Sequence, residues 1–202
     1  MNEFVIPNYI KEIINLLKEN GYEAYLVGGC VRDFLMGRTP HDLDMTTSAT
    51  PDEMLSVFSD YKVIKTGLKH GTITVFVDKN PVEITTYRID GEYLDNRHPS
   101  EVTFTRNLTE DLKRRDFTIN AMAYNEDGLV DCCGGIDDVN EKIIRAVGEP
   151  DRRFLEDALR ILRALRFSSV LSFDIDKHTE KSARKNAKLL KKISAERILV
   201  EL

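Results

Sequence analysis

The chain has 202 residues, of which 42% are hydrophobic and 31% are charged, so it is neither disordered nor fibrous and can form one good-sized domain, or a domain with a small helical partner. Its formal net charge of -5 divides into -10 over residues 1–149 (16 Lys and Arg against 26 Asp and Glu) and +5 over residues 150–202 (13 against 8). An acidic first part suits divalent metal and a basic end suits phosphate, although solvated surface charge alone also produces such an asymmetry.

The sequence contains no membrane span, no secretory signal and no Cys or His metal-binding motif, and these absences guide the expected compartment and metal chemistry. No apolar run approaches the roughly 20 residues that span a bilayer, and the N-terminal segment carries acids where a secretory signal carries bases, so we expect a cytoplasmic protein without membrane association. The cysteines Cys30, Cys132 and Cys133 are odd in number and two are adjacent, which indicates reduced thiols. Without CxxC or HxxxH spacing, any metal should have oxygen ligands.

Helical and extended patterns alternate along the first 60 residues. Residues 8–20 repeat apolar positions at helical spacing and end at Gly21, a typical C-cap. The predicted elements that follow are a strand over 23–29 ending in Gly28-Gly29, a helical turn over 30–37, a strand over 42–47 and a helix over about 51–58. Thr50 and Glu53 have capping-box spacing at the start of this last helix.

The middle of the chain has strand character. Three segments alternate with period two and are rich in β-branched and aromatic residues, namely 61–67, 71–77 and 82–88. Their short connections predict one mixed or antiparallel sheet. The rest is predicted as a mobile loop over 90–110, a segment of helical tendency over 111–125, and a strand, Gly-Gly turn and strand over 129–147. From Glu149 onward the pattern is helical, which predicts a first unit over 1–147 and a helical unit over 148–202.

Two carboxylates, Asp42 and Asp44, stand two positions apart in a predicted strand, so both should point to the same face. This geometry can chelate one or two Mg²⁺ ions. Alternation places Glu83 on the face opposite Val82 and Ile84, and three carboxylates converge if the two strands are neighbours. An acid pair alone is a weak signal, because such pairs are common on edge strands and in turns.

Glycine and arginine residues near this acid pair fit a phosphate group. The Gly28-Gly29 turn can bring backbone N–H groups close to a phosphate, and Arg32 follows one helical turn later as a charged clamp. Further on, Arg115 can contact phosphate or ribose; alternatively, Asp116 caps a helix and the arginines beside it are solvated. The glycine turn and Arg32, with the acid pair, describe a triphosphate held against metal ions.

A continuous helix over 151–167 would place apolar side chains on one arc and charged side chains on the other. The charged arc holds Arg153, Glu156, Asp157, Arg160, Arg163 and Arg166. On its own, this pattern is typical of an amphipathic surface helix with ion pairs three and four residues apart.

As a set, these motifs resemble the class II CCA-adding tRNA nucleotidyltransferases and the related bacterial poly(A) polymerases. The resemblance covers roughly residues 22–167 and rests on three ordered motifs, LVGGCVRDFLMGRTPHDLDMTT, RRDFTINAMAY and EDALRILRALRF. It implies an α+β nucleotidyltransferase head related to DNA polymerase beta over 1–147, with a mixed or antiparallel sheet and flanking helices, followed by an all-helical neck over 148–202. Family members are longer and continue into a body and tail, so residues 150–202 resemble a neck without its continuation and the chain is expected to be a fragment.

The resemblance implies metal-dependent, template-independent transfer of CMP and AMP from CTP and ATP to the 3′ end of tRNA. Asp42 and Asp44 would bind two Mg²⁺ ions, one at the primer hydroxyl and one at the triphosphate, with Glu83 as a third carboxylate. Gly29 and Arg32 would contact the triphosphate, and Arg115 the ribose or phosphate.

Asp157 and Arg160 match the positions at which the family selects bases with protein. A carboxylate accepts from the exocyclic amino group of C or A, and an arginine donates to the ring acceptors; G and U present a carbonyl instead, and the lost hydrogen bond costs about 1–3 kcal/mol. Arg163 and Arg166 match the remaining nucleotide contacts of the family.

Two alternatives remain at this stage. Residues 92–104 resemble the flexible loop that helps CCA-adding members switch from CTP to ATP, which favours CCA addition over poly(A) synthesis or over CC- or A-addition alone. The expected absence of a body and tail, which grip the tRNA in the family, instead suggests a nucleotide- or RNA-binding module with little turnover.

Overall fold

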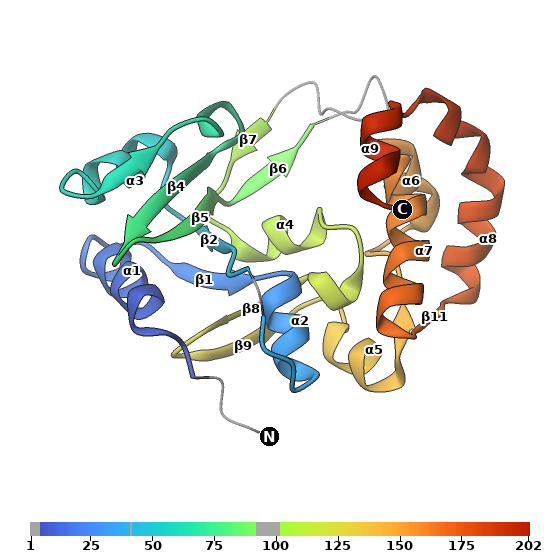
Figure 1. The fold of residues 1–202 in the computed structure, drawn as a ribbon, viewed down its shortest axis with the longest axis horizontal. Coiled ribbons are helices and arrows are strands. Elements are labelled where there is room, and N and C mark those ends of the chain that lie inside the picture. Colours follow the sequence, from blue (N-terminus) through green and yellow to red (C-terminus); the bar gives the residue numbers. More distant parts are fainter. Residues whose placement is uncertain (1–4, 41, 92–101) are drawn as a thin grey trace.

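The computed structural model describes residues 5–40, 42–91 and 102–202. A seven-stranded sheet with helices packed against it forms the larger part, and a helical unit lies beside it (Figure 1). The strands of this sheet, in spatial order, are β3 (Lys62–Ile64), β4 (Thr72–Val77), β5 (Asn80–Thr86), β2 (Met45–Thr47), β1 (Ala24–Val27), β8 (Met122–Asn125) and β9 (Gly128–Asp131). Only the β2–β5 pair is parallel among these neighbours, so the predicted mixed sheet is confirmed.

The helices around the sheet follow local sequence signals. They are α1 (Asn8–Glu19), α2 (Gly29–Leu35), α3 (Pro51–Val57), α4 (Leu108–Lys113), α5 (Gly135–Glu141) and the 3₁₀ turns η1 (Leu68–His70) and η2 (Thr118–Asn120). The predicted capping box is present, because Thr50 Oγ1 accepts from the N–H of Glu53 and Glu53 Oε2 accepts from the N–H of Thr50. Helix α1 buries the apolar stripe that predicted it.

The strand β4 and its partner β5 have one buried and one open face. Ile73, Val75 and Val77 are buried, as are Val82 and Ile84 on β5, whereas the residues between them are half-buried or exposed. This alternation matches the period-two pattern and leaves a polar face on the sheet, on which Glu83 lies opposite Thr74.

The helical unit consists of α6 (Pro150–Glu156), α7 (Leu159–Leu171), α8 (Lys177–Asn186), η3 (Ala187–Lys192) and α9 (Ala195–Val200). It also contains β11 (Asp174–Ile175), which pairs in parallel with β10 (Ile143–Ile144), so the expectation of an all-helical unit was wrong in this detail. Ala164, Phe167 and Leu171 of α7 join the core that α1, β1 and β5 line, and this packing fastens the helical unit to the sheet. No helix in the described part of the chain is both long and apolar enough to cross a bilayer.

Four local predictions differ from the structure. Residues 122–125 form strand β8 instead of continuing a helix, and α5 separates the two strands predicted over 129–147. The single helix predicted over 151–167 is interrupted at Asp157, whose φ of -140° and ψ of 106° are extended. Within the predicted loop, the described residues include β6 (Arg88–Asp90) paired with β7 (Val102–Phe104), and α4; positions 92–101 lie outside the described residues.

Candidate active site

The three candidate carboxylates meet at the junction of β2 and β5. Asp42 and Asp44 lie in the segment just before β2, so their predicted place within a strand was wrong. The parallel register pairs Met45 with Ile84, which sets Asp44 level with Glu83 on the neighbouring strand. Partial desolvation, then the charges of Glu83 and Asp42, raise the pKa of Asp44 against the opposing effect of Arg115. Like charges therefore lie close enough to repel.

This carboxylate cluster fits a divalent cation of the Mg²⁺ type. All three side chains are exposed, and no ion pair between them and another described residue neutralises their charge. The described residues hold no preformed group of three His, Cys, Asp or Glu side chains at metal-ligand spacing. Mg²⁺ tolerates such an open site because it is commonly held by one or two carboxylates, waters and substrate phosphates.

The glycine turn lies next to two guanidinium groups. Gly28 has a φ of 81°, a left-handed conformation that favours glycine, and a Cβ there would lie 3.4 Å from Nη1 of Arg115. A Cβ on Gly29 would lie 3.5 Å from Nη2 of Arg32. Both arginines thus line the turn that joins β1 to α2, as the phosphate hypothesis requires.

The two arginines differ in how firmly they are held. Arg32 is buried and donates to Oδ1 of Asn120 at 2.8 Å and to Oδ1 of Asp33 at 2.7 Å. Arg115 donates from Nη2 to the buried Asp111 at 3.2 Å, while its buried Nε has no hydrogen-bond partner within the described part of the chain. A buried unpaired donor is costly, and a ligand oxygen would satisfy it.

The aromatic ring of Phe167 joins the helical unit to this region. Three guanidinium carbons surround it, those of Arg166 at 4.5 Å, Arg163 at 5.2 Å and Arg32 at 5.4 Å from the ring centroid. Phe117 contacts the same ring edge-on at 5.9 Å. Arg163 and Arg166 therefore reach the same region of the molecule as Arg32, although about 130 positions separate them in the sequence.

The predicted base-selecting residues lie at the break between α6 and α7. Asp157 Oδ1 accepts from the N–H of Leu159 at 3.0 Å, and Oδ2 accepts from Nη2 of Arg197 at 2.8 Å. Arg160 is buried and donates from Nη1 to Glu156 at 2.8 Å and from Nη2 to the carbonyl oxygen of Arg114 at 3.2 Å. Asp157 is thus in the linker rather than on a helix face.

Comparison with known proteins decides the family. Residues 24–145 match the family described as the poly A polymerase head domain, and residues 172–202 match one described as the probable RNA and SrmB-binding site of polymerase A. This chain belongs to the poly A polymerase head-domain family. The resemblance drawn from the three sequence motifs is confirmed.

Individual relatives of this head-domain chain are CCA-adding enzymes. That of Lactobacillus helveticus is 52% identical over 190 residues, which cover 94% of this chain and 47% of the relative. The crystal structure of the Bacillus stearothermophilus CCA-adding enzyme in complex with CTP matches at a TM-score of 0.87 and 44% identity, covering 97% of this chain and 48% of that one. The Thermotoga maritima CCA-adding enzyme complexed with tRNA matches at a TM-score of 0.78 and 29% identity, with 98% and 47% covered. The expected α+β nucleotidyltransferase head fold is confirmed, and the chain spans about half the length of these relatives.

Two charged residues form ion pairs with the candidate nucleotide contacts of this family member. They are Arg197 in α9 and Glu201 at its C-terminal end, and the sequence patterns had not singled them out. Arg197 pairs with Asp157, and the buried Glu201 pairs with Arg166 at 2.6 Å and with Arg163 at 3.5 Å. Arg197 and Glu201 are four positions apart and so share one helix face, which is the local signal that could have identified them.

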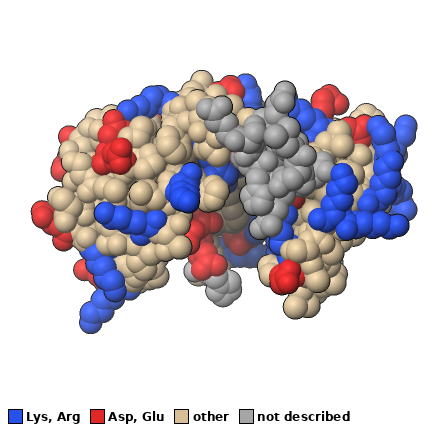
Figure 2. Space-filling view, turned by 90° about the horizontal axis from the view of Figure 1, so that it is seen from above, with Lys and Arg blue, Asp and Glu red and all other residues tan. Residues whose placement is uncertain are grey.

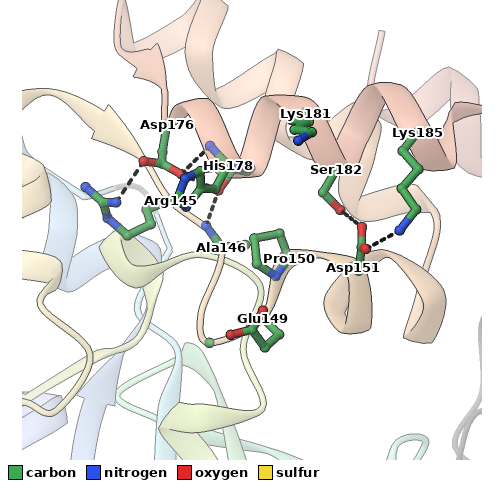
Figure 3. Close-up of a pocket in the computed structure, with 12 residues that line it drawn as sticks. Arg145, Ala146, Glu149, Pro150, Asp151, Asp176, His178, Lys181, Ser182 and Lys185 are labelled. Carbon is green, nitrogen blue, oxygen red and sulfur yellow. Dashed lines mark hydrogen bonds and ion pairs between the residues drawn. The ribbon is translucent and has the colours of Figure 1, made fainter.

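A groove of about 460 Å³ lies apart from these residues, between α8 and the segment that leads into α6 (Figure 3). Its charged groups are largely paired, since Asp151 accepts from Ser182 and Lys185, and Asp176 accepts from Arg145. None of the candidate catalytic or nucleotide contacts lines it. The groove therefore lies outside the candidate site.

Asp116 caps neither α4 nor η2; instead, it forms a buried ion pair with Arg163 at 2.7 Å. Burial raises its pKa, but Arg163 and the N–H of Phe117 more than offset this effect and hold the pKa below its ordinary value. Asp116→Asn should therefore lower the free energy of unfolding at pH 7 by about 1–3 kcal/mol. The contribution is full above the unfolded pKa, about 3.9, and is lost as the pH falls through the lower folded value.

Urea unfolding of both proteins at pH 7 and at acidic pH tests this linkage. The stability difference should shrink toward acidic pH, because the original protein loses the charged carboxylate there. A difference independent of pH would attribute the loss to packing rather than to the charge of Asp116.

Proposed function

We propose that this chain is the head and neck, divided near residue 147, of a CCA-adding tRNA nucleotidyltransferase that transfers CMP and AMP from CTP and ATP to the 3′ end of tRNA. The observation that carries the proposal is the convergence of Asp44 and Glu83 across β2 and β5, with Arg115 close enough to influence the pKa of Asp44. The names of the relatives at about 50% identity support CCA addition, and the complex of the Thermotoga maritima enzyme with tRNA supports the choice of tRNA.

The cation chemistry is assigned to the carboxylate cluster. Asp42 and Asp44, with Glu83 beside them, would hold two Mg²⁺ ions, which supply Lewis-acid stabilisation of the phosphate charge and lower the pKa of the primer hydroxyl. Arg115 and Arg32 are proposed to bind the triphosphate, because both line the Gly28 and Gly29 turn and carry permanent positive charge.

Recognition of the base of the incoming nucleotide is assigned to Asp157 and Arg160. Each carboxylate oxygen of Asp157 already accepts one hydrogen bond and has a second lone pair free for the amino group of C or A. Arg160 uses three of its five N–H donors on Glu156 and on two backbone carbonyl oxygens, which leaves two for ring acceptors of the base. Arg163 and Arg166 are proposed as further nucleotide contacts around Phe167.

Incorporation of labelled nucleotides into tRNA that lacks the terminal CCA tests this function. Addition of two C residues and one A is the expected result. Long A tracts on arbitrary RNA without use of CTP would support the second candidate, poly(A) polymerase, which the head-domain description favours. Binding of CTP and ATP without incorporation would indicate a nucleotide-binding module instead.

The basic surface along α8 and η3 is proposed to contact RNA phosphates. Residues 177–192 contain six Lys and one Arg against one Glu, a net charge of +6, and Lys and Arg gather at this end of the molecule (Figure 2). Lys177, Lys181 and Lys188 are exposed and have no ion-pair partner among the described residues. The match of residues 172–202 to a probable RNA-binding family supports this assignment.

Replacing these three lysines with glutamine should weaken tRNA binding and reduce the slope of log K against log salt by about 1 for each lost phosphate contact. Fluorescence anisotropy over a salt series measures both. The matched control is Lys11→Gln with Lys18→Gln on α1, at the other end of the molecule (Figure 1). If the slope of log K against log salt were the same for the unsubstituted protein, the triple variant and the control, this surface would not contact the RNA.

A further inference from the structure

One buried carboxylate, that of Asp111 in α4, lies behind the candidate triphosphate contact Arg115 and has no assigned role. Its side chain is 0% exposed. Its Oδ2 accepts from Arg115 Nη2 at 3.2 Å and from Thr46 Oγ1 at 3.5 Å, while Oδ1 accepts from Arg114 Nη2 at 2.7 Å and from the N–H of Arg88 at 3.2 Å. This one group therefore connects β2, the start of β6 and both arginines of the Arg114-Arg115 pair.

The connection to β2 sets Arg115 relative to the carboxylate cluster. Thr46 lies in β2, two residues after Asp44, and its hydroxyl reaches the carboxylate oxygen that also binds Arg115. On the other side of the guanidinium, Nη1 of Arg115 faces the position that a Cβ on Gly28 would occupy, at 3.4 Å. Arg115 is thus fixed between Asp111 and the glycine turn, with its Nε still unpaired among the described residues.

The charges around Asp111 are divided unequally between the two arginines. Arg114 is bound to Asp111 and also lies 3.7 Å from Asp90, a carboxylate that it shares with Arg88. Arg115 has Asp111 as its only ion-pair partner within the described part of the chain, and it shares that carboxylate with Arg114. Arg115 thus has fewer carboxylate partners than Arg114 and lies on the side of the Gly28 turn, where its positive charge would attract a polyphosphate.

We propose that Asp111 is a positioning residue that orients Arg115 for the triphosphate of the incoming nucleotide. This inference rests on the proposed function, which assigns Arg115 to the triphosphate. An arginine side chain loses conformational entropy when it is held in one rotamer. If Asp111 already holds Arg115 in place, this entropy is lost on folding and not on binding, so the affinity for the nucleotide is higher. Asp111 acts through Arg115 and does not itself touch the nucleotide.

The test compares the affinities of CTP and CMP, because only CTP carries the β- and γ-phosphates. Asp111→Asn should weaken CTP binding in the presence of Mg²⁺ by about tenfold, roughly what loss of one charge-assisted hydrogen bond produces, and change CMP binding by less than about twofold. In the Arg115→Ala background, the same substitution should cause no further loss of CTP affinity, since the two residues act as one unit.

Asp90→Asn is the matched control, because it removes another largely buried carboxylate that pairs with Arg114 and Arg88. It should leave the ratio of CTP to CMP affinity unchanged even if it lowers the melting temperature. Should Asp111→Asn fail to fold, Asp111→Glu keeps the charge but displaces the carboxylate from Arg115 and Thr46. It should lower the same affinity ratio in the Arg115 protein and leave it unchanged in the Arg115→Ala protein.

The outcomes separate this inference from the proposed function. If Arg115→Ala lowers the CTP-to-CMP ratio but Asp111→Asn and Asp111→Glu do not, then Asp111 is only a structural ion pair and the inference is overturned while the function stands. If Arg115→Ala itself leaves the ratio unchanged, the assignment of Arg115 to the triphosphate fails, and the positioning role of Asp111 fails with it.

Discussion

Asp44→Asn should lower the rate of nucleotide incorporation by about 1,000-fold while the protein remains folded. A weakened metal site would stabilise the charge of the transition state less, by several kcal/mol. Because about 1.4 kcal/mol corresponds to a tenfold change in rate, a loss of this size gives the expected factor. Asparagine keeps the size of the side chain and one oxygen but removes the negative charge that lies level with Glu83, just before the start of β2. Single-turnover incorporation of labelled CMP into tRNA at saturating CTP and Mg²⁺ measures the effect.

The stability of this variant should move in the opposite direction to its activity. The folded protein raises the pKa of Asp44 through partial desolvation and the charges of Glu83 and Asp42, which means that folding disfavours the ionised form. At pH 7, a neutral asparagine relieves this repulsion, so the melting temperature should stay the same or rise. A lost activity with unchanged or higher stability would separate a catalytic role from a structural one.

Asp52→Asn is a suitable control, because Asp52 is an exposed acid in the first turn of α3 and lies outside the carboxylate cluster. It should incorporate CMP at the original rate. The metal-site hypothesis would be abandoned if Asp44→Asn were as active as this control, since the acid pair is then a surface feature of the segment before β2.

The sheet and its open face could be predicted because their signals are local. The alternation of β4 and β5 assigned Glu83 to the open face, and Thr50 with Glu53 marked the start of α3. Helix α5 was missed because Gly134-Gly135 has the sequence of a hairpin turn. A Cβ on Gly135 would lie 2.3 Å from the carbonyl oxygen of Thr118, so glycine is required there by close packing against η2 rather than by a turn between strands.

The break at Asp157 could not be predicted, since the apolar period continues across it. The backbone of Asp157 is extended and not helical. Its carboxylate accepts hydrogen bonds from the N–H of Leu159 and from the guanidinium of Arg197, which is 40 positions away. Tertiary contacts of this kind override the local preference of Phe154 to Ile161 for one helix. The sequence motifs therefore singled out the candidate nucleotide contacts, but not Arg197 and Glu201, which pair with them.

Asp157→Ala should remove the preference for CTP and ATP over UTP and GTP. In the proposed arrangement, the carboxylate accepts from the amino group of C or A and meets a carbonyl oxygen of U or G, a mismatch of about 1–3 kcal/mol that corresponds to a factor of about 5 to 150. Alanine accepts from neither group, so the four affinities should approach one another. Titration of the four nucleotides in the presence of Mg²⁺ measures this change.

Because the substitution also leaves Arg197 without its carboxylate, a second variant is needed to interpret it. Arg197→Met removes the partner and keeps Asp157, and it should reduce the preference less than Asp157→Ala does, since the carboxylate stays anchored by the N–H of Leu159. Asp151→Ala, in the same helical unit but paired with Lys185, should keep the full preference. If the unsubstituted chain bound all four nucleotides equally, selection would require the RNA, and Asp157 would act only after the primer is in place.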